Sequence, residues 1–399
     1  MRPLFVYQKF GLGGIKMVIS ASLIEEITAL RHQFHQQPEL SNHEVKTTAR
    51  ITKILQDWGI TVKQTALNTG VVAEIQGGHP GKEITLRADI DALPVTEATG
   101  LPWASQNTGV MHACGHDIHF CSLLGAAFLL QQDRANLSGT IQLLFQPAEE
   151  QDHGAEQVLD AHVLDNTVAM AGFHNNPNLP VGTIGLKAGS LMAGCYHFDI
   201  TLHGAGSHGA APEKGRDPIV AQAAIVSQLQ TVVSRNVSPL DAAVVSVTQV
   251  HGGETWNVLP ETVTLGGTVR TFTDEATVLV KQRMTKLVKQ IAAAFDQTAD
   301  FEWAIGAYPI QNDAQLVEAI RPLVSANATV VTPTVSMAGE DFATFQQQIP
   351  GVFAFIGSNG APDAADWHDP HFIGLDETLP VGIQYFVDAA HGLSTFAAK

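Results

Sequence analysis

Residues 84–91 read Ile-Thr-Leu-Arg-Ala-Asp-Ile-Asp, an apolar run that ends in two aspartates, Asp89 and Asp91. Residues 140–150, Thr-Ile-Gln-Leu-Leu-Phe-Gln-Pro-Ala-Glu-Glu, follow the same pattern and end in two glutamates. A third apolar run, 168–173, is followed directly by a histidine. Short apolar runs between polar clusters are typical of buried strands. The sequence therefore predicts three buried strands that carry acids or a histidine at their carboxyl ends.

A helix is predicted between the first two of these strands. Its apolar face carries Phe120, Leu123, Leu124, Ala127 and Leu130. Strands that alternate with helices indicate an α/β fold with a larger, mostly parallel sheet covered by helices. Ligands bind such sheets at the carboxyl ends of the strands, so we expect a metal site there. Earlier in the chain, Ser22 followed by Glu25 predicts the start of another helix through a capping box.

The length of 399 residues predicts two domains. Residues 17–187 and 301–399 are expected to form the larger domain. In residues 188–300 the pattern of predicted strands and helices changes. This segment is expected to form a smaller, inserted α+β domain of strands and two long helices. Residues 1–16 fit neither domain and are expected to be a disordered or non-native extension, because Met17 opens the first well-patterned segment.

Composition excludes several classes of partner. The chain has 22 Lys and Arg against 39 Asp and Glu, a formal charge of −17, which disfavours nucleic acid and anionic membranes. No apolar run reaches the roughly 18 residues that cross a bilayer. Three cysteines are too few for a disulfide framework and favour a reducing, cytoplasmic location.

Cysteine, histidine and glutamate residues stand where a metal site would need them. Cys114 and His116 offer a thiolate and an imidazole two residues apart, and both bind zinc, manganese, cobalt or nickel. Glu149 and Glu150 are adjacent, so one could bind metal while the other acts as general base. His174 follows the third strand.

Each of these signals also has an ordinary structural explanation. Cys114 could be a buried core cysteine, the glutamate pair a solvated loop, and His174 a hydrogen-bonded core histidine. Asp89 or Asp91 could cap a turn, although either could instead orient a metal-binding imidazole. Together with His368 in a Trp-His-Asp-Pro-His-Phe loop, however, the set is best explained by metal.

The segment Gly204–Gly209 matches two other motifs weakly. It fits Gly-x-Gly-x-x-Gly, but Pro212 and Gly215 stand where a dinucleotide-binding helix should open. It also nearly matches an esterase nucleophile elbow, and again no helix follows at once. We therefore interpret these glycines as allowing the backbone to approach a ligand, with His208 projecting into it.

The chain resembles the aminoacylase and glutamate-carboxypeptidase family of metallopeptidases, and within it the amidohydrolase branch of N-acyl-amino acid, hippurate and auxin-conjugate hydrolases. The segments that carry the resemblance are His35–Leu40, Arg87–Pro94, Met111–Asp117, Phe145–Glu150, Gly172–His174, Gly204–Gly209, Asn257–Pro260, Gly267–Arg270, Gly339–Phe342 and His368–Phe372. They occur in the family's order over residues 20–385.

The resemblance implies a site for two divalent metal ions, zinc, manganese, nickel or cobalt. The implied ligands are Cys114, His116, Glu150, His174 and His368. Glu149 would be the general base for attack by a metal-bound hydroxide, and Asp91 matches the family's orienting aspartate. Asp89 stands where related peptidases carry a metal-binding histidine.

The resemblance also implies that the smaller domain is a lid that forms a homodimer. His208 matches a lid histidine that polarises the scissile carbonyl, often across the dimer. Asn257 and Arg270 match substrate-binding positions, with Arg270 expected to bind a carboxylate. Two departures from the family pattern are Asn175-Asn176 after His174, which affects the expected pocket shape, and Ser207 in place of glycine.

The predicted function is hydrolysis of the amide bond of small N-acyl-L-amino acids, including N-acetyl-diaminopimelate-like or hippurate-like substrates. Two alternatives remain at this point. One is a dipeptidase or carboxypeptidase with the same metal site and a pocket for a small peptide. The other is a metal-binding protein without catalytic activity, against which the intact Glu149-Glu150 pair argues.

Overall fold

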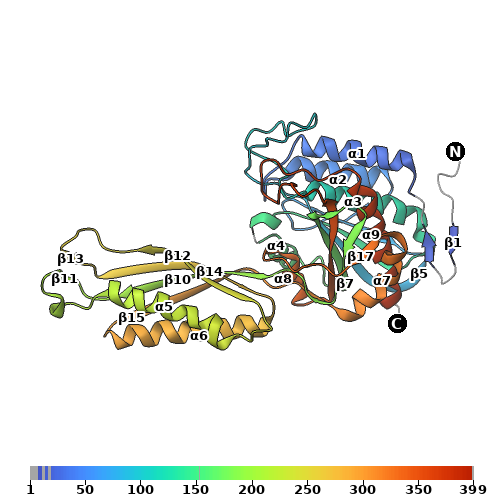
Figure 1. Cartoon of the computed structure of the whole chain (residues 1–399). Coiled ribbons are helices and arrows are strands. Elements are labelled where there is room, and N and C mark those ends of the chain that lie inside the picture. Colours follow the sequence, from blue (N-terminus) through green and yellow to red (C-terminus); the bar gives the residue numbers. More distant parts are fainter. Residues whose placement is uncertain (1–7, 11–13, 17–18, 152, 398–399) are drawn as a thin grey trace. The chain divides into compact units, whose positions relative to one another are not determined.

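A computed structural model describes residues 8–10, 14–16, 19–151 and 153–397 (Figure 1). The chain forms two compact units: the larger comprises Met1–Gly189, Gln311–Thr334 and Thr344–Lys399, and the smaller Ser190–Ile310 and Val335–Ala343. The prediction for residues 1–16 falls largely outside the described residues. Within that stretch, β1 (Gln8–Phe10) and β2 (Gly14–Lys16) pair antiparallel.

The larger unit is built on an eight-stranded sheet. In spatial order its strands are β17 (Thr329–Val331), β8 (Thr183–Gly185), β18 (Gly351–Asn359), β7 (Thr167–Pro180), β5 (His79–Asp89), β6 (Ser138–Gln146), β4 (Val71–Gln76) and β3 (Thr61–Val62). The four central strands β18, β7, β5 and β6 are parallel, whereas β4 and β3 join antiparallel at one edge. The predicted α/β class with a mostly parallel sheet is confirmed.

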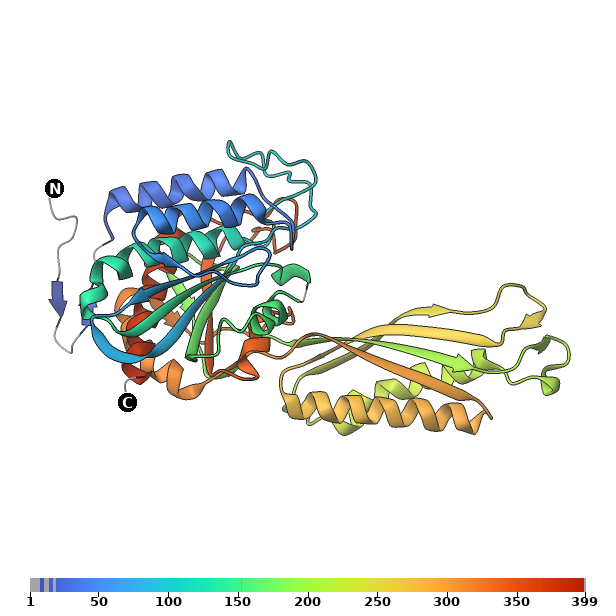
Figure 2. The same ribbon diagram turned by 180° about the vertical axis from the view of Figure 1, so that it is seen from behind.

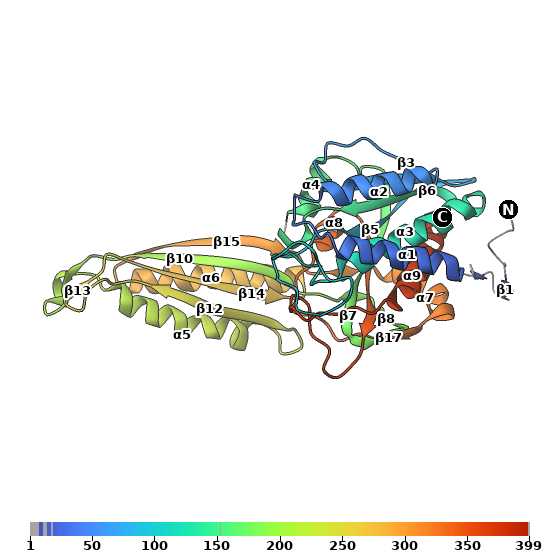
Figure 3. The same ribbon diagram turned by 90° about the horizontal axis from the view of Figure 1, so that it is seen from above.

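Helices surround this sheet. They are α1 (Ala21–His35), α2 (Val45–Asp57), α3 (His116–Asp133), α4 (Gly154–Asp160), α7 (Ala314–Asn327), α8 (Phe342–Gln346) and α9 (Thr378–Ala397). Helix α3 is apolar around most of its circumference, as expected for a helix inside a core. It packs on β5 and α9, and α1 packs on α3 (Figure 3). The first helical residue of α3 is thereby fixed beside the carboxyl end of β5.

The capping box predicted at Ser22 and Glu25 was wrong by two residues. Helix α1 begins at Ala21, and Ser20 is its N-cap, with its hydroxyl accepting a hydrogen bond from the backbone N–H of Leu23 at 3.2 Å. Ser20 has the extended backbone that an N-cap requires, whereas Ser22 is already helical.

The smaller unit is an antiparallel sheet covered by two helices. Its strands are, in order, β12 (Ala243–His251), β14 (Thr262–Thr271), β10 (Gly194–His203) and β15 (Thr298–Ala307), and its long helices are α5 (Pro218–Asn236) and α6 (Asp274–Ala294). Both helices lie on one face of the sheet (Figures 1 and 2). Alternate residues of β10 are accordingly buried and exposed. Because β15 pairs with β10, the unit runs to Ile310, about ten residues past the boundary expected from sequence.

Among the described residues, none of the helices is both long enough and apolar enough to cross a lipid bilayer.

Candidate metal centre

Most candidate ligands of the larger unit stand at strand and helix ends, but His174, which was expected to follow the end of its strand, lies inside β7 because that strand continues to Pro180. Glu149 and Glu150 begin a short 3-10 turn, Glu149–Gln151, just after β6, and His174 lies within β7. Cys114 precedes α3, and His116 is its first residue. Gly115 between them has φ +85°, and a Cβ there would lie 2.4 Å from the side-chain nitrogen of Asn175. Only glycine fits this turn, which places Cys114 and His116 on one side of the helix end.

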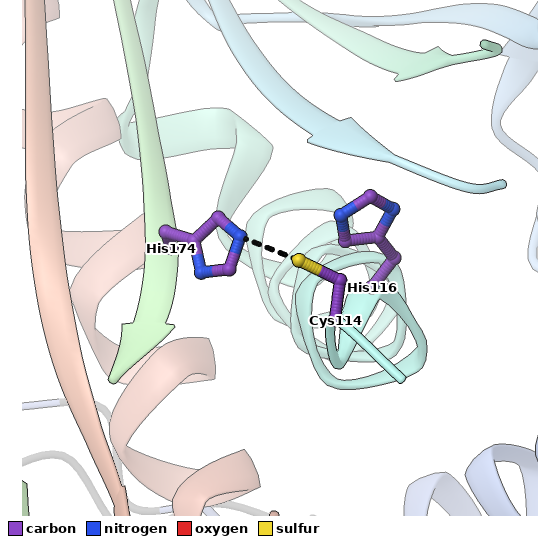
Figure 4. Close-up of side chains that lie close together, drawn as sticks. All are labelled: Cys114, His116 and His174. Carbon is purple, nitrogen blue, oxygen red and sulfur yellow. Dashed lines mark hydrogen bonds between the residues drawn. The ribbon is translucent and has the colours of Figure 1, made fainter. Parts of the chain in front are cut away.

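The structure brings all five predicted ligands together. Cys114 Sγ lies 3.3 Å from His174 Nε2 (Figure 4). Glu150 connects two histidines, with one oxygen 3.6 Å from His116 Nε2 and the other 3.5 Å from His368 Nε2. The ligand atoms of each of three overlapping groups lie within 4.8 Å of one another: Cys114, His116 and His174; Cys114, Glu150 and His368; His116, Glu149 and Glu150.

Hydrogen bonds to the other ring nitrogens leave the Nε2 atoms available for a metal. His116 Nδ1 lies 3.0 Å from the backbone oxygen of Asp91 and 3.2 Å from its carboxylate. His174 Nδ1 lies 2.8 Å from the backbone oxygen of Asn175. Both Nδ1 atoms therefore carry the proton in the neutral rings, and both Nε2 lone pairs face the cluster.

Two buried polar atoms of the cluster lack a hydrogen-bond partner among the described residues. Neither His116 Nε2 nor Glu150 Oε1 has a hydrogen-bond partner within the described part of the chain. Buried polar atoms are nearly always paired, and unpaired ones call for an ion or another ligand. Thiolate, imidazole and carboxylate donors around such atoms fit zinc, cobalt, nickel or manganese.

The electrostatics of the cluster also fit a cation. Burial raises the pKa of the Cys114 thiol well above its usual value, and the nearby Glu150, Glu149 and Asp89 raise it further. Burial alone would lower the pKa of His116, but Asp89, Asp91 and Glu150 outweigh burial and raise it to about 10. The pocket therefore favours positive charge, which a divalent cation supplies while allowing the thiol to ionise.

Asp91 organises the region around His116. One carboxylate oxygen contacts His116, and the other accepts hydrogen bonds from the Ser41 hydroxyl at 2.7 Å and the Glu150 backbone N–H at 2.9 Å. Burial opposes ionisation of Asp91, but hydrogen bonds from His116, Glu150 and Ser41 hold its pKa below the usual value. Asp91 thus lies where an orienting carboxylate was expected. Glu149 is 8% exposed and lies 4.0 Å from His116 Nε2, at the edge of the ligand set.

Sequence reasoning missed a buried polar network behind the ligands. Asp89 contacts Arg87 Nη1 at 2.8 Å and His119 Nδ1 at 2.6 Å. His119 Nε2 in turn accepts the backbone N–H of Asn175 at 2.9 Å, and the Asn175 side chain donates to the Cys114 backbone oxygen at 2.6 Å. The signal for His119 was its position three residues after His116, on the same side of the helix.

The three site residues predicted in the smaller unit fall into two places. His208 is exposed in β11 (Ser207–His208), which pairs with β13 (Val258–Leu259), and the N–H of the next residue donates to the Asn257 backbone oxygen at 2.8 Å. Arg270 lies on β14 opposite Cys195, near the start of β10. His208 lies beyond the other end of β10. The structure therefore brings His208 and Asn257 together, and places Arg270 at the opposite end of the sheet.

Comparisons with known proteins extend over most of the chain. The sequence model of peptidase family M20/M25/M40 matches residues 85–392. The N-acetyl-L-cysteine deacetylase of Bacillus subtilis (strain 168) is 47% identical over 92% of this chain and 88% of its own length. The N-acetyldiaminopimelate deacetylase of Leuconostoc mesenteroides is 38% identical over 84% of this chain and 89% of its own length. A crystal structure from Bacillus subtilis, described as a dinuclear metal binding peptidase from the M20 family, aligns with a TM-score of 0.85 and 41% identity, covering 94% of this chain and 99% of that one.

Proposed function

Because the chain belongs to peptidase family M20/M25/M40, we propose that it hydrolyses the amide bond of small N-acyl-L-amino acids at the cluster around Glu150. Membership in this family confirms the resemblance that the sequence motifs indicated. The proposed amide hydrolysis agrees with relatives that are named as deacetylases of N-acetylated amino acids. The observation that carries the proposal is the convergence of Cys114, His116, Glu150, His174 and His368 beside Glu149.

The described side chains fit the parts of such a reaction. Two divalent cations held by the five ligands would polarise the amide carbonyl and lower the pKa of a water molecule. Glu149 accepts the proton of the attacking water and returns it to the leaving amine nitrogen. Asp91 holds the His116 ring, so its Nε2 stays directed at the cluster. His208 donates to the carbonyl oxygen, while Asn257 and Arg270 bind the substrate, Arg270 through its carboxylate.

The positions of His208 and Arg270 support a homodimer as part of this proposal. A strand of ten residues such as β10 spans on the order of 30 Å, which is longer than a small N-acyl amino acid. One chain therefore cannot present both ends of this sheet to the same substrate, and His208 and Asn257 would come from a second copy. Strand β12 is an edge strand of the sheet, so a second chain could pair with it. Val250 on this strand has 47% of its surface exposed to solvent.

A cytoplasmic location is also proposed. All three cysteines are free, and Cys114 would be needed as a thiolate ligand, which a reducing compartment preserves.

The proposal is tested with a substrate panel. Purified protein is stripped of metal, reloaded separately with zinc, manganese, cobalt or nickel, and assayed against N-acetyl-cysteine, N-acetyl-diaminopimelate, hippurate and dipeptides. Release of the free amino acid from the N-acyl compounds is expected, at rates that exceed those for dipeptides. Faster cleavage of dipeptides would assign the site to a peptidase, and no metal-dependent hydrolysis of any compound would overturn the proposal.

A further inference from the structure

Glu44 is a buried carboxylate for which the proposed reaction has no role. It precedes helix α2, its side chain is 0% exposed, and no basic side chain forms an ion pair with it in the described segments. Burial raises the pKa of its carboxyl group, and the charge of Asp91 raises it further. Such a group costs folding free energy, so its hydrogen bonds indicate what it contributes.

Those hydrogen bonds lead to the turn that carries the glutamate pair. One carboxylate oxygen of Glu44 accepts the backbone N–H of Ala148 at 2.8 Å, and the other accepts the Thr69 hydroxyl at 2.8 Å. Ala148 is the residue immediately before Glu149. The contact therefore joins the N-terminus of α2 to the start of the catalytic segment, across more than a hundred residues of sequence.

Ala148 has an unfavourable backbone conformation that needs such support. Its φ is 56°, in the left-handed region that alanine adopts only when its surroundings require it. Two glycines leave space for this turn: a Cβ on Gly70 would lie 2.7 Å from the Pro147 ring, and one on Gly154 would lie 2.0 Å from the Pro147 backbone oxygen. The turn is thus held closely from both sides, and its direction decides where the next two side chains point.

A second carboxylate holds the other side of Glu149. The backbone N–H of Glu150 donates to Asp91 at 2.9 Å, so the amides immediately before and after Glu149 are both bound by buried acids. Glu149 lies between these two contacts, 4.0 Å from His116 Nε2.

We infer that Glu44 is a positioning residue for the reaction, and that together with Asp91 it clamps the backbone on either side of Glu149. The clamp fixes the general base against the attacking water and Glu150 between His116 and His368. This inference rests on the proposed amide hydrolysis, but the clamp itself is a property of the backbone and is measurable without substrate.

Two conservative variants separate the reach of the Glu44 side chain from its charge. Glu44→Gln keeps an oxygen at the same distance from the Ala148 N–H and removes the charge. Glu44→Asp keeps the charge and withdraws the acceptor by one methylene group. We expect Glu44→Asp to lower kcat by roughly 10- to 100-fold with KM changed by less than about threefold, because small displacements of a reacting group have effects of this order. Glu44→Gln should retain kcat within about threefold.

Hydrogen–deuterium exchange of the peptide that contains residues 147–151 supplies the second measurement. Exchange should be faster in Glu44→Asp than in the wild type and unchanged in Glu44→Gln. Thr69→Val is the matched control, since it removes the other hydrogen bond to Glu44 and leaves the Ala148 contact, and its kcat should stay within about threefold. Circular dichroism confirms that each variant is folded.

Equal losses in the Gln and Asp variants, or a larger loss in Gln, would overturn the clamp, as would unchanged exchange in Glu44→Asp. Should the wild type hydrolyse none of the N-acyl compounds, the proposed function fails on its own, and the exchange measurements still decide whether Glu44 holds the turn.

Discussion

Glu149 and Glu150 are neighbours in the chain but have different surroundings, and this difference supports the separate roles proposed for them. Glu150 lies between His116 and His368, with one oxygen near each ring. Glu149 lies at the edge of that set. This position outside the two histidine contacts supports the proposal that Glu149 exchanges a proton with the attacking water.

Substituting Glu149 by glutamine should therefore remove turnover without removing metal. Glutamine has nearly the same shape but cannot accept the proton, and general acid–base catalysis is worth roughly 10²- to 10⁴-fold in rate. We expect kcat to fall by that order while the metal content, measured by elemental analysis, stays at the wild-type level. A variant that kept more than about a tenth of wild-type kcat would remove Glu149 from its role.

Asn175 should matter for the stability of the site. Its side chain donates to the backbone oxygen of Cys114 and accepts from Ser358. Asn175→Ala leaves buried partners unpaired, so the free energy of unfolding should fall by about 1–3 kcal/mol in urea titrations. The neighbouring Asn176, whose side chain accepts only a local N–H from Asn178 among the described contacts, is the control. An equal loss in Asn176→Ala would contradict this role for Asn175.

The positions of the strands and helices explain why the metal ligands could be predicted from the sequence, whereas the residues that hold those ligands in place could not. Cys114, His116, Glu150 and His174 were predictable because strand ends and a helix start of an α/β fold meet at one edge. Glu44 was not, because a buried glutamate at the start of a helix gives no sequence signal of its partner. His119 was missed although it stands three residues after His116, because that spacing does not show that its partner is Asp89. The domain boundary expected at residue 300 falls inside β15, which the sequence did not indicate because its pairing with β10 is not local.

The contacts of His35, at the end of helix α1, predict that the free energy of unfolding depends on pH. Its ring lies 3.0 Å from Asp117 and 3.2 Å from Glu97. Burial lowers the pKa of His35, but Asp117 and Glu97 outweigh burial and raise it to about 9. A raised pKa means that the protonated ring stabilises the folded state fully below about pH 6.5 and that this contribution is lost as the pH rises through 9.

We expect the wild type to lose stability, on the order of 3 kcal/mol, between pH 6.5 and 9.5. His35→Gln should lack this part of the slope. Urea titrations across that range measure both proteins at matched metal content. Parallel slopes for the two proteins would show that His35 does not titrate in this way.

At the scale of the whole molecule, the proposed homodimer predicts complementation between two inactive variants. His208→Ala should lower kcat more than it changes KM, because the ring is proposed to act on the developing oxyanion. If His208 acts across subunits, dimers formed from Glu149→Gln and His208→Ala chains contain one intact site. Mixing and re-forming the dimers should restore about a quarter of wild-type activity, because half of them are mixed.

The control is the same mixture without dissociation and reassociation, which should stay inactive. Size-exclusion chromatography reports the oligomeric state. A monomer in solution, or dimers that re-form without recovering activity, would contradict action across subunits.

The buried helix α3 has a consequence for how the chain is made in the cell. Its apolar surface is covered by α9, the last helix, and β18 completes the parallel centre of the sheet only after residue 351. A ribosome releases residues in order, so the metal centre cannot close until synthesis is nearly finished, whereas the sheet of the smaller unit has all its strands by residue 307. During that interval α3 remains uncovered, and nascent chains that stall before α9 are expected to be bound by chaperones or degraded.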